Sequence, residues 1–193
     1  MRCLIDVDGV VCDLHTEWLR RYNAEYGDNL TNEDIKEWGL KPFVRPECGD
    51  RIYDYLNENL YGVETPAIGG AREGLERLRR AGDTITFVTS CVAPGMFDSK
   101  VEWLRREGMM YKPDGLVATL DGTSKLVVAG DVLIDDRGET VRKFTWAGRI
   151  AILFTQPWNR DDWAPARMES WEEVEEDGMA GFLRRRVMAG AVA

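Results

Sequence analysis

Short apolar runs alternate with amphipathic stretches through most of this 193-residue chain. Apolar runs occupy 84–89, 115–118, 131–135 and 149–154, and helical or turn-like stretches separate them. This alternation is typical of a parallel α/β sheet, in which helices connect neighbouring strands. An earlier apolar run at 2–7 ends at a turn, so we expect it to form the first strand. The pattern predicts an α/β fold with helices flanking the sheet.

Helical spacing of apolar residues, together with capping residues, predicts the helices. They cover 13–26, 31–38, 49–60, 71–81, 97–107, 139–147 and 169–187. Only residues 16–65 break the alternation of strands and helices, and they follow the first strand directly. We therefore expect 1–15 and 66–193 to form the core and 16–65 to form a small helical cap inserted after strand 1.

Composition excludes several classes of protein. The net charge of −9 argues against binding to duplex nucleic acid, which requires many Lys and Arg contacts to phosphates. The single histidine, His15, argues against a Ser-His-Asp triad or a His-based zinc site, and we expect it on a helix surface. The four cysteines lack zinc spacing, which indicates free thiols and a cytoplasmic protein. We expect no signal peptide and no membrane span, since no apolar run approaches ~20 residues.

Polar side chains gather where three of the predicted strands end. They are Asp6 and Asp8, then Thr89 and Ser90, then Asp135 and Asp136, with Lys125 just before the last of these strands. The carboxyl ends of parallel strands meet at one edge of a sheet, so we expect these groups to converge. Converging carboxylates repel one another unless a cation lies between them. The sequence therefore predicts a site for Mg²⁺, which prefers oxygen ligands.

The pair Asp6 and Asp8 suits phosphoryl transfer. Both side chains can face one cavity once the chain turns at Gly9. One carboxylate can then attack phosphorus while the other delivers a proton to the leaving oxygen. Thr89 offers a hydroxyl and Lys125 a positive charge to the phosphoryl oxygens.

Together these motifs resemble those of the haloacid dehalogenase (HAD) superfamily of phosphotransferases. The matching features are DVDGV at 6–10, a strand ending in Thr89, Lys125 and the pair Asp135-Asp136. The resemblance implies a Rossmann-like core in which Asp6 is the nucleophile that forms an aspartyl-phosphate. It implies that Asp8 is the general acid and base and that its backbone carbonyl helps to hold Mg²⁺. Thr89, Ser90 and Lys125 would bind the phosphate.

A narrower resemblance is to the 5′(3′)-deoxyribonucleotidase family. It is carried by KLVVAGDVLIDD at 125–136, TFVTS at 86–90, KVEWL at 100–104 and AILFTQPWN at 151–159. It implies that Asp136 is the metal ligand, beside Asp6 and Asp8, and that Asp135 supports it. The segment EDIKEWGL at 33–40 is similar to the cap of that family, and implies that Trp38 contacts the base of the substrate.

The sequence thus predicts a Mg²⁺-dependent hydrolase of nucleoside monophosphates, favouring deoxyribonucleotides. One alternative is a HAD phosphatase for another small metabolite, such as a sugar phosphate. Another is a non-catalytic nucleotide-binding protein on the same fold. The expected partner is a small phosphorylated substrate, with no duplex nucleic acid and no membrane, and the sequence is compatible with a homodimer. Lys100 is expected to pair with Glu102 or to face solvent.

Overall fold

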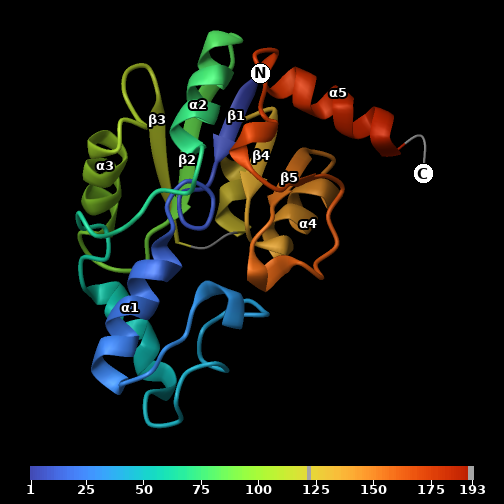
Figure 1. The fold of residues 1–193 in the computed structure, drawn as a ribbon. Coiled ribbons are helices and arrows are strands. Elements are labelled where there is room, and N and C mark those ends of the chain that lie inside the picture. The colour runs from blue at the N-terminus through green and yellow to red at the C-terminus, as the bar shows by residue number, and fades with distance from the viewer. Residues whose placement is uncertain (121–122, 191–193) are drawn as a thin grey trace.

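The computed structural model describes residues 1–120 and 123–190, and the described strands form a six-stranded parallel sheet (Figure 1). Residues 121–122 and 191–193 of the predicted core lie outside the described ranges. The sheet has the order β3-β2-β1-β4-β5-β6. Its strands are β1 (Arg2–Ile5), β2 (Thr84–Ser90), β3 (Gly115–Thr119), β4 (Val132–Asp135), β5 (Ile150–Phe154) and β6 (Arg167–Met168). The parallel α/β architecture predicted from the alternating pattern is confirmed.

Helices pack on both faces of the sheet, which explains why its central strands are apolar throughout. The helices are α1 (Leu14–Tyr26), α2 (Ala71–Arg80), α3 (Met96–Arg106), α4 (Gly138–Trp146) and α5 (Gly178–Gly190). Successive strand residues point to opposite faces. Ile5 accordingly belongs to the larger core cluster, with residues of α2 and α5, whereas Leu4 belongs to a smaller cluster with Val141 and Phe144 of α4.

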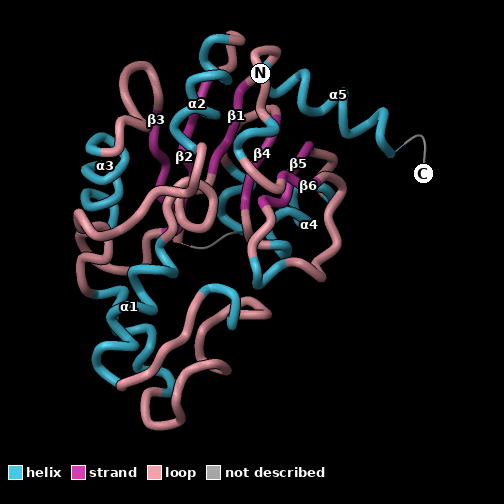
Figure 2. Tube along the Cα trace, viewed as in Figure 1, coloured by secondary structure: helices cyan, strands magenta, loops and turns pink. Residues whose placement is uncertain are grey.

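Residues 14–65 contain α1 and two 3₁₀ helices, η1 (Asn32–Asp34) and η2 (Gly49–Asn57), and no strand is assigned to them. Much of this region is loop (Figure 2), and it lies below the carboxyl edge of the sheet in the view of Figure 1. Its buried residues, including Trp18 and Ile52, belong to the larger core cluster. The region is therefore packed against the rest of the chain.

The long helix predicted over 169–187 is wrong in its first half. The structure instead has a 3₁₀ turn, η5 (Trp171–Glu173), and α5 begins only at Gly178. Ser170 and Glu173 form a capping box that closes a single turn. Gly178 then has a φ of +63°, which the interior of an α-helix cannot accommodate, so α5 can begin at Gly178 but cannot extend back through it. None of the described helices is both long enough and apolar enough to cross a bilayer.

Candidate active site

A tight turn after β1 brings Asp6 and Asp8 to the same cavity. The Asp6 amide donates to the carbonyl of Ile134 at 2.9 Å, so Asp6 continues the pairing of β1 with β4. Gly9, with a φ of +72°, then reverses the chain. A Cβ atom added at Gly9 would lie 2.2 Å from Oδ2 of Asp136, so a larger residue does not fit there. The turn is therefore pressed against the end of β4.

Lys125 lies between Asp6 and Asp135 and neutralises part of their charge. Its Nζ is 2.6 Å from Oδ2 of Asp6 and 2.7 Å from Oδ2 of Asp135, and all three residues are buried. Burial alone lowers the pKa of Lys125, but the two carboxylates outweigh it and raise that pKa above its ordinary value. Burial raises the pKa of Asp6 to about 6, against the opposing charge of Lys125. Lys125 thus favours the ionised form of Asp6.

The two carboxylates at the end of β4 have different surroundings. Both oxygens of Asp135 are occupied, since Oδ2 contacts Lys125 and Oδ1 accepts the Arg137 amide at 2.9 Å. Asp136 accepts one bond at Oδ2, from the Trp158 indole at 3.0 Å. Its Oδ1 is buried and has no hydrogen-bond partner among the described residues. Burial, followed by the nearby charges of Asp135 and Asp6, raises the pKa of Asp136 well above its usual value.

This acidic cluster fits a hard cation. Carboxylate oxygens of Asp6, Asp135 and Asp136 lie within 4.8 Å of one another. A buried oxygen that lacks a partner costs free energy, and a bound cation would satisfy it. Because both oxygens of Asp135 already have donors, the free oxygen of Asp136 favours Asp136 as the ligand. The donor set, all oxygen, is the type that Mg²⁺ prefers.

Lys100 of α3 is the main residue of the site that sequence reasoning missed. It is fully buried, and its Nζ donates to Asp8 Oδ2 at 2.7 Å, to Thr89 Oγ1 at 2.6 Å and to the Ser90 carbonyl at 2.8 Å. The expected pairing with Glu102 or solvent is therefore wrong. A signal was present, because Lys100 has helical spacing with the buried Met96 and Trp103. A lysine on the apolar face of a helix needs a buried partner.

Asp8 also accepts a hydrogen bond from Tyr61. The hydroxyl of Tyr61 donates to Oδ1 at 2.9 Å, and Lys100 lies 5.4 Å from the centre of its ring. Burial, followed by the negative charge of Asp8, raises the pKa of Tyr61 well above its usual value. Tyr61 therefore keeps its proton. Both oxygens of Asp8 have a donor, an arrangement that suits the ionised carboxylate.

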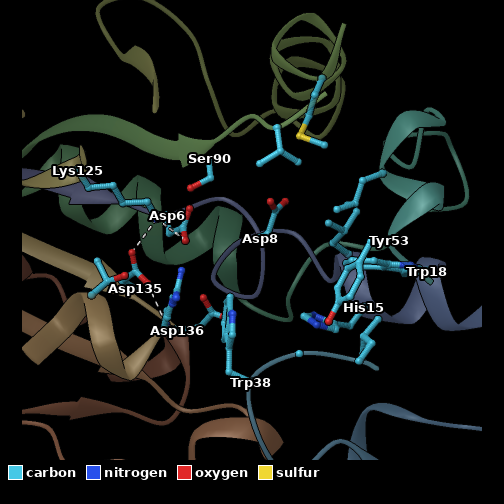
Figure 3. Close-up of a pocket in the computed structure, with 18 of the residues that line it drawn as sticks. Asp6, Asp8, His15, Trp18, Trp38, Tyr53, Ser90, Lys125, Asp135 and Asp136 are labelled. Atoms are coloured by element: carbon cyan, nitrogen blue, oxygen red, sulfur yellow. Dashed lines mark hydrogen bonds and ion pairs between the residues drawn. The ribbon is translucent and has the colours of Figure 1, made fainter. Parts of the chain in front are cut away.

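A cavity of about 320 Å³ joins these charged groups to an aromatic region (Figure 3). In the view of Figure 3, Asp6, Lys125, Asp135 and Asp136 lie together, Trp18 and Tyr53 lie apart from them, and Asp8 and Trp38 lie between the two groups. Trp38, half-exposed, thus lines the cavity, and the guanidinium of Arg137 lies 5.2 Å from the centre of its ring.

Two predicted positions look different in the structure. Thr89 is fully buried and does not line the cavity; its hydroxyl accepts from Lys100, whereas Ser90 lines the cavity. His15, expected on a helix surface, instead lines the cavity and is partly buried, with its ring centre 4.1 Å from that of Trp158. It follows the Asp8 turn closely in sequence, so the first turn of α1 directs it inward.

Two solved structures with a similar fold are described as hydrolases of the HAD superfamily. One, from Deinococcus radiodurans with bound phosphate and sodium, has a TM-score of 0.56 and 17% identity, over 89% of this chain and 92% of that chain. Another, from Geobacter sulfurreducens, has a TM-score of 0.52 and 14% identity, over 90% of this chain and 97% of that chain. The fold is therefore that of HAD hydrolases.

The sequence profile of the family described as 5′ nucleotidase, deoxy (pyrimidine), cytosolic type C protein matches residues 1–183, and the chain belongs to this family. One relative named 5′(3′)-deoxyribonucleotidase, from Clostridium acetobutylicum, is 28% identical over 171 residues, which are 89% of this chain and 91% of that protein. Another with the same name, from Bacillus subtilis, is 26% identical over 89% of this chain and 94% of that protein. A mitochondrial one from Homo sapiens is 27% identical over 165 residues, 80% of this chain and 70% of that protein. The resemblance inferred from the motifs is confirmed, and the protein is an enzyme of the phosphatase class.

Proposed function

We propose that this enzyme uses Mg²⁺ to hydrolyse the phosphomonoester of nucleoside monophosphates, and of deoxyribonucleotides in particular. The observation that carries the proposal is the single cavity that joins the Asp6 cluster to the aromatic region around Trp18 and Tyr53. Charged groups at one end suit a phosphate, and flat apolar side chains at the other suit a nucleobase. The names of the relatives point to the same substrate class.

Asp6 is the proposed nucleophile. Its Oδ1 accepts the Val7 amide at 2.7 Å and its Oδ2 contacts Lys125, so the carboxylate is held in one orientation. A carboxylate oxygen attacks phosphorus, the bond from phosphorus to the nucleoside oxygen breaks, and an aspartyl-phosphate forms. Lys125 offsets negative charge on the phosphoryl oxygens, and Ser90 faces the same part of the cavity.

Asp8 is the proposed general acid and base. It gives a proton to the leaving nucleoside oxygen and then takes one from the water that hydrolyses the aspartyl-phosphate. The second step needs the ionised form, which its two donors support. The first step needs the protonated form. The Tyr61 hydroxyl can rotate from donor to acceptor, so it can accommodate that proton.

Asp6, the backbone carbonyl of Asp8 and Asp136 are the proposed Mg²⁺ ligands. When bound, the cation would supply positive charge against the phosphoryl oxygens. Lys125 and the Trp158 indole hold Asp6 and Asp136 in place. Asp135, whose oxygens are already occupied, orients Lys125.

Residues 16–65 are the proposed cap over the substrate. Their side chains supply much of the aromatic end of the cavity, including Trp18, Trp38 and Tyr53. Trp38, which is half-exposed, is the proposed contact to the base. This division assigns phosphate chemistry to the sheet edge and substrate choice to the cap.

A panel of phosphomonoesters tests the proposal, with wild type and Asp6→Asn assayed in Mg²⁺ and in EDTA. We expect nucleoside monophosphates to give the highest kcat/KM, with Mg²⁺ required and Asp6→Asn inactive. Preference for sugar phosphates would show that the substrate class is wrong. Equal activity in wild type and Asp6→Asn would show that Asp6 is not the nucleophile.

A further inference from the structure

His15 has an unusual position for a histidine. One face of its ring packs on Trp158, at 4.1 Å between ring centres, and Trp18 stacks nearby at 6.0 Å. Trp158 does not line the cavity, whereas His15 and Trp18 do (Figure 3). The imidazole thus packs against Trp158, near Trp18, and lines the cavity.

Neither ring nitrogen of His15 has a hydrogen bond to another described residue. The Nδ1 atom is fully buried and unpartnered. Of the two nitrogens, Nε2 is therefore the one left to reach a molecule in the cavity. The apolar surroundings also keep the ring neutral, because burial lowers the pKa of His15 to about 4, against the charges of Asp8 and Asp13. In Figure 3 His15 lies beside Tyr53 and Trp18, apart from Asp6 and Lys125, so the group that it would meet is not the phosphate.

The position of the proton follows from the burial of Nδ1. A buried N–H without an acceptor is rarer in proteins than a buried acceptor without a donor. The proton is then best placed on Nε2, and Nε2 becomes a donor that faces the cavity. The matching group on a ligand is a neutral acceptor, such as a carbonyl oxygen of a nucleobase.

We propose that His15 is a specificity-determining residue, whose Nε2–H donates a hydrogen bond to an acceptor on the base of the bound nucleotide. The proposal rests on the proposed function and deepens it, since it assigns base recognition to one residue. Other groups at the aromatic end are poorer candidates. Tyr53 is more exposed, and Arg137 is paired with Glu139.

His15 is the only histidine in the chain, so NMR can observe its imidazole without ambiguity in protein that lacks a histidine tag. Asp6→Asn protein, labelled with ¹⁵N and supplied with Mg²⁺, is titrated with deoxyuridine 5′-monophosphate, deoxyribose 5-phosphate and inorganic phosphate. We expect the Nε2 resonance to shift with the nucleotide alone. A shift of equal size with deoxyribose 5-phosphate, or no shift with a nucleotide that demonstrably binds, would overturn the proposal.

Kinetics of three variants provide the second readout. The measured quantity is the ratio of kcat/KM for the nucleotide to kcat/KM for deoxyribose 5-phosphate. His15→Phe keeps the ring packing but loses the donor, and should lower this ratio about three- to tenfold, the usual worth of one hydrogen bond. His15→Gln, whose amide can donate from a similar position, should restore much of it. A fall caused by Tyr53→Phe but not by His15→Phe would assign the base contact to Tyr53.

The outcomes separate the two proposals. If wild type hydrolyses no nucleoside monophosphate above the Asp6→Asn background, the proposed function fails, and the role of His15 fails with it. If wild type hydrolyses nucleotides but all His15 variants keep the wild-type ratio, only the role of His15 is refuted. If His15→Phe lowers kcat/KM equally for both substrates, His15 has a structural role.

Discussion

The Nζ atom of Lys100 lies 2.7 Å from Oδ2 of Asp8, and no part of the lysine side chain is exposed to solvent. The lysine is buried, whereas 28% of the Asp8 side chain is exposed, so removing the lysine leaves a carboxylate that water can still reach. This lysine also bonds Thr89 and Ser90. It therefore connects the carboxyl end of β2 to the turn that contains Asp8.

Lys100→Met is expected to lower the free energy of unfolding by about 1–3 kcal/mol, because Asp8 and the Thr89 hydroxyl lose a donor. Turnover should fall as well, since Asp8 is no longer held. Lys41→Met is the matched control, because Lys41 pairs with Asp50 where both side chains are exposed. It should change stability by less than about 0.5 kcal/mol. Urea unfolding measures the free energy of unfolding of each variant. Equal losses in Lys100→Met and Lys41→Met would contradict the structural role of Lys100.

Asp8→Asn should collapse turnover while substrate still binds, because the leaving oxygen loses its proton donor. The expected fall in kcat is about 10²- to 10⁴-fold, the usual contribution of a general acid. Tyr61→Phe removes one donor to Asp8 without changing the charge, so it should cost much less. Single-turnover kinetics and nucleotide binding measure the two effects. Near-normal turnover in Asp8→Asn would rule out its assigned role.

Asp136→Ala should raise the Mg²⁺ concentration needed for half-maximal activity, since it removes the carboxylate with a free oxygen. Asp135→Ala should act differently. It removes one of the two carboxylates paired with Lys125 and the acceptor of the Arg137 amide, so the main effect should be on stability. Thermal unfolding with and without Mg²⁺ distinguishes the effects of the two variants. If Mg²⁺ raises the Tm of Asp136→Ala as much as that of wild type, Asp136 is not a ligand.

Gly9→Ala should damage both folding and activity. A positive φ alone costs an alanine roughly 1–2 kcal/mol, and here the new methyl group would also meet Asp136 Oδ2 at 2.2 Å. Gly27→Ala is the matched control, because Gly27 has a φ of +59° and no atom within 4 Å of an added Cβ. The difference between the two variants in chemical denaturation measures the packing of the turn on Asp136. Equal losses would show that this packing contributes nothing.

His15 should make the protein less stable in acid. Its pKa is about 4 in the folded chain and about 6.5 when unfolded, so only the unfolded chain takes up a proton between these values. The contribution of the neutral His15 to the free energy of unfolding is therefore complete above pH 6.5. It is lost as the pH falls towards 4, by up to about 3 kcal/mol. His15→Phe lacks this dependence. Urea unfolding of both proteins at pH 7 and pH 4.5 should show a larger drop in wild type, and parallel curves would contradict the assigned burial.

The sheet and the residues at its edge could be predicted because buried parallel strands are continuous apolar runs. The runs at 2–7, 84–89 and 131–135 correspond to β1, β2 and β4. Their order in the sheet brings Asp6, Ser90 and Asp136 to one cavity. The proposed roles of these residues stay predictions until the variants are measured.

The surroundings of Asp8 could not be predicted in the same way. Helical spacing marks Lys100 as buried, but it does not say which strand end the buried face meets. Tyr61 lies in a segment without regular structure, where spacing gives no direction. The helix predicted over 169–187 failed for a related reason: its charged residues have helical propensity, yet the capping box at Ser170 and the backbone of Gly178 interrupt it.

Contacts from residues 158–171 hold the carboxyl ends of both β4 and β1. Trp158 and Asn159 hold Asp136, and the Trp171 indole donates to the carbonyl of Val10 at 2.7 Å, directly beside the Asp6–Asp8 turn. The turn that carries the proposed nucleophile, Asp6, therefore takes its surroundings from residues more than a hundred positions later in the chain. The geometry of the site is thus set by packing between segments that are distant in sequence, and not by the local turn alone.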